Sequence, residues 1–238
     1  MDIVSPDVER FYEQLAVLER QPGQGRRLSE CTGRSAWPNR GVYFFREPGE
    51  YRRRRPEVPR IVRVGTHAVS ANAKSTLWGR LRAHRGGHNG GGNHRGSIFR
   101  LHVGAALLAR DGGQIGSLSS WGLGTSTPKA VRDCEGEHEQ RVSAYLGAMS
   151  VLWIDVPDEP GIGSARAYVE RNVIALLSNQ FRPLDLPSNE WLGNHSPNDK
   201  IRRSGLWNLR DIEKSYDPAF LEVLTGFVAR SAVNVRAT

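Results

Sequence analysis

The amino-acid sequence predicts an α+β fold in which a small mixed or antiparallel sheet is flanked by helices. Two short β-prone runs, residues 41–45 and 61–65, lie close enough in the sequence to pair as a hairpin. A third apolar run at residues 151–156, closed by Pro157, predicts a buried strand late in the chain. Segments with helical periodicity lie before, between and after these runs, which is the arrangement expected of an α+β protein.

The first segment predicts a helix that ends near Arg20. Ser5 and Pro6 favour the start of a helix, and the following apolar residues have helical spacing: Val8, Phe11, Leu15 and Leu18. Residues 21–39 contain Gly, Pro and Ser and predict a loop.

The connection between the two strands of the hairpin, residues 46–60, is rich in Pro and Arg and predicts a long loop. Four consecutive arginines, residues 52–55, lie in it. They are interpreted either as a solvated, flexible tip or as a contact to phosphate.

Three helices are predicted in the middle of the chain. Ser75 is the expected cap of the first, which runs from Thr76 to about Arg85 and ends in the glycine-rich residues 86–93. Ser97 is expected to cap the second, through residue 109, although residues 98–103 also partly fit a strand. A loop at 111–128 and a polar helix at 129–146 follow.

Two further helices are expected after the late strand. Ser164 is the predicted cap of a strongly patterned helix to about Ser178. The last clear helix is predicted at residues 218–229, after short helical pieces in the tail.

The composition favours a polyanionic partner. Lys and Arg total 33 against 25 Asp and Glu, which gives a net charge of +8. No segment approaches the roughly 20 apolar residues of a membrane span, and the two cysteines form no disulfide framework, so a cytoplasmic protein is expected. The sequence contains no GxxxxGK[ST] pattern, and no nucleotide cofactor is expected.

Glu170 stands out in the helix after Ser164 because it falls within the apolar stripe. Ala167 and Ile174 are its neighbours at helical spacing, so its carboxylate is expected at the edge of the core. A half-buried carboxylate needs a metal ion or an arginine as partner. A glutamate that reaches solvent, or pairs for structural reasons only, is the alternative.

The helix after Ser75 also carries charged side chains at helical spacing, but these are cationic. Arg80 and His84 lie four residues apart and point in one direction, while Arg82 and Arg85 belong to a second stripe suited to phosphate. Taken singly, such an arginine is more often solvated and such a histidine more often a core residue. Together with Glu170 and Tyr43 they provide the groups needed for phosphodiester cleavage, namely a cation, a possible base, a carboxylate for a metal and a phenol.

The order of these motifs resembles that of the GIY-YIG nucleases. The matching segments are Gly-Val-Tyr at 41–43, Arg-Val-Gly-Thr at 63–66, the helix at 77–84 with its Arg and His, and the later helical Glu170. The pairing of Arg with His is most similar to the restriction endonuclease branch of that family. The resemblance implies a GIY-YIG core and a metal-dependent DNA endonuclease, with restriction or another defence role as the best guess.

The resemblance also implies a role for each matching residue. Tyr43 would act as base or proton relay beside the attacking water, and Glu170 would hold one Mg²⁺ or Mn²⁺ per active site. Arg80 would stabilise charge on a non-bridging oxygen, and His84 would help to accept a proton. Arg63 stands where the family has its second tyrosine, and could contact the scissile phosphate instead.

Two departures from the motif pattern of the family leave other functions open. The asparagine that commonly follows the metal glutamate has no match at a convincing spacing, with Asn179, Asp185 and Asn189 as candidates. Arg63 in place of tyrosine favours a catalytically weak or inactive nucleic-acid-binding module as the second hypothesis. A basic protein-interaction domain is the third.

Domain boundaries follow from the same resemblance. An N-terminal helix and loop are predicted at 1–39, a nuclease core at 40–186 with an insertion at about 86–149, and a C-terminal extension at 187–238. The tryptophans of the extension are expected to anchor it on the core, with base stacking as the alternative. DNA is the expected partner and a homodimer is possible. The predicted DNA-binding residues outside the catalytic set are Arg82, Arg85, His94, Arg95, Lys200, Arg202 and Arg203.

Overall fold

A central antiparallel sheet with helices on both faces organises the computed structural model, which describes residues 5–112, 118–161 and 163–234. Its strand order is β1-β4-β2-β3. The strands are β1 (Arg26–Arg27), β2 (Gly41–Arg52), β3 (Arg55–Gly65) and β4 (Ser150–Asp155). The predicted α+β class is therefore confirmed, and the sheet is antiparallel throughout.

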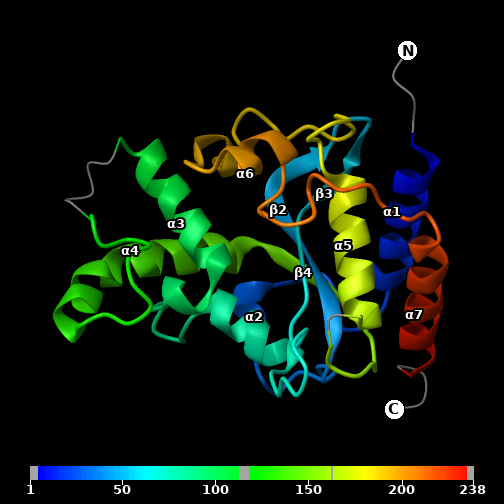
Figure 1. The fold of residues 1–238 in the computed structure, drawn as a ribbon, viewed down its shortest axis with the longest axis horizontal. Helices are drawn as coiled ribbons and strands as arrows, with labels where there is room; N and C mark the ends of the chain where they lie inside the picture. Colours follow the sequence, from blue (N-terminus) through cyan, green and yellow to red (C-terminus); the bar gives the residue numbers. More distant parts are fainter. Residues whose placement is uncertain (1–4, 113–117, 162, 235–238) are drawn as a thin grey trace.

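The helices form one layer on each side of the sheet (Figure 1). The described helices are α1 (Pro6–Glu19), α2 (Leu77–Arg85), α3 (Ile98–Arg110), α4 (Lys129–Ala148), α5 (Ala165–Leu177), α6 (Asp199–Ser204) and α7 (Phe220–Asn234). Three single 3₁₀ turns accompany them: η1 (Leu28–Glu30), η2 (His94–Gly96) and η3 (Leu192–His195). Within the described part of the chain, no helix combines the length and the apolar character that a membrane span requires.

Side chains alternate between two hydrophobic cores along strand β2. Val42 and Phe44 face the core built with α1, α5 and α7, whereas Tyr43 and Phe45 face the core built with α2, α3 and α4. This alternation follows from the two-residue period of a strand. It places the hydroxyl of Tyr43 on the side of the sheet where α2 lies.

The hairpin differs from the prediction of a long loop. Strands β2 and β3 extend through most of residues 46–60 and leave only a turn at residues 53 and 54, with register shifts along the pair. Arg52 is not part of a flexible tip, since it is buried and forms ion pairs with Glu9 and Asp185 at 2.7 Å each. Charged strand residues are buried here because partners far away in the sequence neutralise them, which local pattern does not reveal.

Most helix starts agree with the prediction. The hydroxyls of Ser97 and Ser164 cap α3 and α5, and α3 excludes the alternative strand at 98–103. Helix α2 is capped by Thr76, which accepts from the amide of Gly79, and not by Ser75. Of the predicted loop at 111–128, residues 113–117 lie outside the described part of the chain.

The C-terminal extension closes the free edge of β3. The Trp207 amide donates to the Val62 carbonyl at 2.8 Å, and the Asn208 side chain bonds both the amide and the carbonyl of Val64. The indole nitrogens of Trp191 and Trp207 both donate to Glu47. The prediction that these tryptophans anchor the extension is confirmed.

Candidate active site

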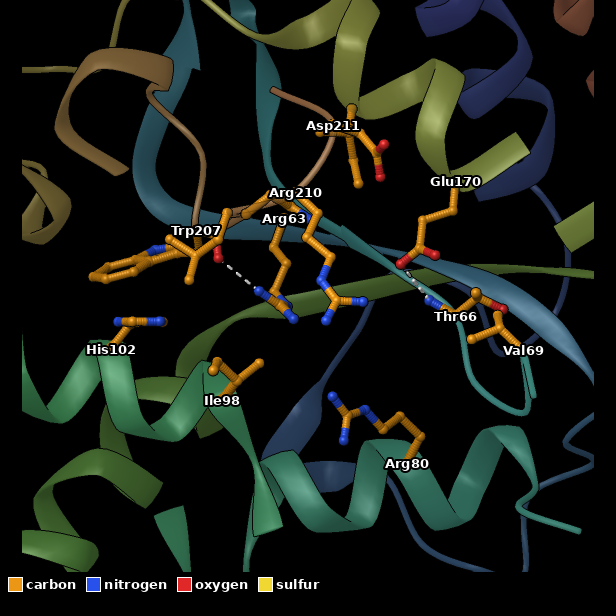
Figure 2. Close-up of a pocket in the computed structure, with 13 residues that line it drawn as sticks. Arg63, Thr66, Val69, Arg80, Ile98, His102, Glu170, Trp207, Arg210 and Asp211 are labelled. Carbon is orange, nitrogen blue, oxygen red and sulfur yellow. Dashed lines mark hydrogen bonds between the residues drawn. The ribbon is translucent and has the colours of Figure 1, made fainter. Parts of the chain in front are cut away.

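A cavity of about 420 Å³ lies at the edge of β3, between the two helical layers. Strand β3, helices α2, α3 and α5, and the C-terminal segment 207–211 all contribute to its walls (Figure 2). Its lining residues are Arg63, Thr66, Val69, Arg80, Ile98, His102, Glu170, Ile174, Trp207, Asn208, Leu209, Arg210 and Asp211. Three of the predicted catalytic residues, Arg63, Arg80 and Glu170, therefore share one cavity.

Glu170 reaches the cavity from α5, whose apolar residues pack on one face of the sheet. Its Oε1 accepts a hydrogen bond of 3.0 Å from the amide of Thr66, just beyond the end of β3. Burial raises the pKa of Glu170 to about 7, and the positive charges of Arg63 and Arg80 only partly oppose this effect. The predicted half-buried carboxylate at the edge of the core is observed.

Arg63 comes from the opposite face of the sheet, because it pairs across the hairpin with Phe45. Arg63 is only 7% exposed, and its guanidinium lies 4.6 Å from the ring centre of Phe99 and donates to the Trp207 carbonyl at 2.6 Å. Burial lowers its pKa, and its Nε has no hydrogen-bond partner among the described residues. A buried guanidinium with an N–H group that has no partner and with no carboxylate bonded to it retains capacity to bind an anion.

Tyr43 and His84 form a hydrogen-bonded pair on the same face of the sheet. The Tyr43 hydroxyl and His84 Nε2 are 2.8 Å apart, and His84 Nδ1 lies 2.7 Å from the Ser97 hydroxyl. Burial, and then the charges of Arg80, Arg63 and Arg100, lower the pKa of His84 well below its usual value, so the imidazole is neutral. Both rings are fully buried and contribute no surface to the cavity wall, although the Tyr43 hydroxyl interacts with Arg63.

Gly65 is required by this arrangement. It is the cross-strand partner of Tyr43, and a Cβ atom at residue 65 would lie 2.2 Å from the Tyr43 hydroxyl. No side chain fits at that separation. The glycine of the Arg-Val-Gly-Thr motif thus leaves space for the phenol of the Gly-Val-Tyr motif.

Positive charge exceeds negative charge in the cavity wall. The side chains of Arg80 and Arg210 form no ion pair or hydrogen bond with a described residue, and Arg63 forms no ion pair with one. Of the two carboxylates in the wall, Asp211 is neutralised by Lys214 at 2.7 Å. The cavity therefore suits an anionic ligand.

The donor set fits one hard divalent cation. Glu170 Oε2 accepts no hydrogen bond from a described residue, and the carboxylate is directed toward the cavity (Figure 2). Within the described ranges no three His, Cys, Asp or Glu side chains gather as a ready-made metal site. A single carboxylate is nevertheless the usual protein contribution to Mg²⁺, which retains several waters and binds substrate oxygens.

The predicted DNA-binding residues near the insertion have mostly internal partners. Arg85 is buried and donates to the Cys31 carbonyl at 2.6 Å, and His94 is buried against Glu139 and stacked on Trp121. Arg95 forms a bidentate pair with Glu135. Arg85 thus ties α2 to the N-terminal segment, and His94 and Arg95 hold parts of the insertion together, whereas Arg82 is exposed. All four remain predicted DNA contacts.

The basic residues of α6 lie on the surface. Lys200 pairs with Glu213, and Arg202 and Arg203 both pair with Asp199. None of the three contributes to the cavity wall. They remain predicted DNA contacts away from the catalytic residues.

The structure adds residues that sequence reasoning missed. Asn208, Arg210 and Asp211 enter the cavity from the C-terminal extension, and His102 enters from α3. The three candidates for the family asparagine lie elsewhere: Asn179 and Asp185 have structural partners, and Asn189 is on the surface. Asn208 is the asparagine at the site, and only its neighbour Trp207 marked this segment in the sequence.

Three arginines, Arg63, Arg80 and Arg210, thus give the cavity an excess of positive charge around the carboxylate of Glu170. The chain belongs to the GIY-YIG family, since the model of the GIY-YIG domain matches residues 3–234. This family is part of the nuclease superfamily, and the match extends over the N-terminal helix and the C-terminal extension. No curated protein and no solved structure matches the chain.

Proposed function

We propose that this protein is a divalent-metal-dependent DNA endonuclease that hydrolyses phosphodiester bonds, with restriction or another defence role in the cytoplasm. The observation that carries the proposal is the convergence of Arg63, Arg80 and Glu170 on one cavity with excess positive charge. The net charge of +8 supports a polyanionic substrate.

Glu170 is the proposed ligand of one Mg²⁺ or Mn²⁺ ion. When bound, the ion supplies electrostatic stabilisation of the scissile phosphate and of the leaving oxygen. The carboxylate is oriented by the amide of Thr66, which leaves Oε2 available. Because the pKa of Glu170 is about 7, ligation competes with protonation near neutral pH.

Arg63 and Arg80 are the proposed phosphate-binding residues. They enter from different elements, strand β3 and helix α2, so a phosphate between them is held from two directions. Charge-assisted hydrogen bonds from guanidinium groups strengthen as negative charge develops on the non-bridging oxygens. Arg63 thereby takes over phosphate contact at the position where the family has a tyrosine.

Tyr43 and His84 are the proposed proton-accepting pair. The neutral imidazole is bonded to the phenol, and the phenol hydroxyl also interacts with Arg63 in the cavity wall. The charges of Arg63 and Arg80 disfavour an imidazolium, and a bound phosphate offsets those charges. The pair is thus suited to accept a proton when the substrate is present, through Tyr43 and not by direct contact of His84 with the water.

Plasmid cleavage tests this proposal. Supercoiled DNA is incubated with Mg²⁺ or Mn²⁺ and with the wild type, Glu170→Gln or Glu137→Gln. Glu137 is an exposed carboxylate on α4 outside the cavity, so its variant is a matched control. We expect nicking by the wild type and the control, and at least about 100-fold slower nicking by Glu170→Gln.

The cleavage and binding results distinguish a metal-dependent nuclease, an inactive DNA-binding module and a protein with neither function. Equal nicking by the wild type and Glu170→Gln excludes the metal assignment. Salt-sensitive DNA binding without nicking supports the inactive binding module, which the replacement of tyrosine by Arg63 favours. Absence of salt-sensitive DNA binding excludes both functions.

A further inference from the structure

Arg210 is the third arginine in the wall of the cavity, and no motif of the nuclease core contains it. It lies in the C-terminal segment, and its guanidinium is directed into the same space as those of Arg63 and Arg80 (Figure 2). Arg210 forms no hydrogen bond or ion pair with a described residue. Its side chain is therefore available to a ligand at the mouth of the cavity.

The backbone that carries Arg210 is held firmly on both sides. On one side, Trp207 and Asn208 are bonded to the edge of β3. On the other, Asp211 has a positive φ of 63° and accepts from the amide of Lys214, which also forms an ion pair with its carboxylate. A fixed backbone lowers the entropy lost when the side chain binds a ligand.

A solvated surface arginine is the simplest alternative, since Arg210 is exposed. A solvated arginine, however, gains no favourable electrostatic interaction when its guanidinium is directed toward two other cations. Arg63 already carries the cost of burial without an ion pair, and a third positive charge adds repulsion. An oxyanion between the three groups converts this repulsion into attraction.

We propose that Arg210 is a phosphate-binding residue of this site and donates to a non-bridging oxygen of the phosphate that is cleaved. This inference rests on the proposed function and extends it, because it makes the C-terminal extension part of the machinery that holds the scissile phosphate. The ligand class is a phosphodiester, bound by its charge and not by its sequence.

Single-turnover cleavage at saturating duplex tests the inference with Arg210→Gln, Arg210→Lys and Arg230→Gln. Arg230 is also an exposed arginine of the extension but lies on α7 outside the cavity, so it is the matched control. We expect Arg210→Gln to cleave about 100-fold more slowly with duplex affinity changed by less than about threefold. Arg210→Lys should retain part of the rate, and the control should retain all of it.

A second measurement needs neither metal nor cleavage. In a ¹⁵N-edited spectrum of arginine side chains, inorganic phosphate should shift the Nε resonance that disappears in Arg210→Lys. A normal cleavage rate with weakened duplex affinity would place Arg210 on flanking DNA and overturn the inference, as would an unshifted Nε resonance. Failure of the wild type to cut DNA contradicts the proposed function, while the phosphate titration still decides the role of Arg210.

Discussion

Replacing Glu170 by Gln should stabilise the folded protein at high pH. Between pH 4.5 and about 7 the folded state holds a proton on this carboxyl that the unfolded chain has released. Stability is therefore lost as pH rises through this window, and it stays lost above it. A pKa raised from 4.5 to about 7 corresponds to about 3 kcal/mol for a fully shielded group, and the half-buried Glu170 should show about 1–2 kcal/mol.

Urea unfolding in EDTA at pH 5 and pH 8 measures this effect. We expect Glu170→Gln and the wild type to be nearly equal at pH 5, and the variant to be more stable at pH 8. Glu137→Gln should follow the wild type at both values. A variant that is less stable than the wild type at pH 8, or a difference that does not change with pH, would refute the electrostatic reasoning. Added Mg²⁺ should stabilise the wild type at pH 8 and leave Glu170→Gln unchanged.

Three further substitutions test the packing of Tyr43 and the attachment of the C-terminal extension. Tyr43→Phe removes the hydroxyl that is bonded to His84, and we expect nicking to fall by about 10²–10⁴-fold with a loss of about 1–3 kcal/mol in urea unfolding. Gly65→Ala forces a methyl group toward the Tyr43 hydroxyl, so thermal unfolding should show a loss of about 1–3 kcal/mol, and an unchanged melting temperature would contradict the packing. Glu47→Ala leaves the indole N–H groups of Trp191 and Trp207 unpaired, and should cost about 2–3 kcal/mol in urea and slow nicking; a stable variant with full activity would show that this anchor is dispensable.

The helices that carry Glu170 and Arg80 were predictable because their signals are local. The spacing of Ala167, Glu170 and Ile174 placed the carboxylate at the edge of the core, and the spacing of Arg80 and His84 placed both on one side of α2. A 3.6-residue period and a capping residue are enough for such predictions. The helical period does not predict how deeply a side chain is buried. His84 is fully buried beside Tyr43, whereas Arg80 is half-buried and open to the cavity.

The long-range pairing of polar residues was not predictable from the sequence. Glu47, Glu50, Arg52 and Arg60 interrupt the hydrophobic pattern and made their segment resemble a loop. In the structure they are buried strand residues with partners in α1 and in the extension. The same applies to Arg85, whose partner is the Cys31 carbonyl. No spacing within a segment indicates a partner more than 40 residues away.

The position of β3 at the edge of the sheet explains how the site is assembled. Arg63 and Tyr43 belong to one face and Glu170 to a helix on the other, and a strand in the middle of the sheet would separate them. Beyond the last residues of an edge strand, side chains from both faces can meet, and the backbone amide of Thr66 donates a hydrogen bond to Glu170 there. An open edge would also expose unpaired backbone groups. The C-terminal segment covers that edge through Trp207 and Asn208. Because Arg210 follows two residues after Asn208, the segment that covers the edge also brings Arg210 to the cavity.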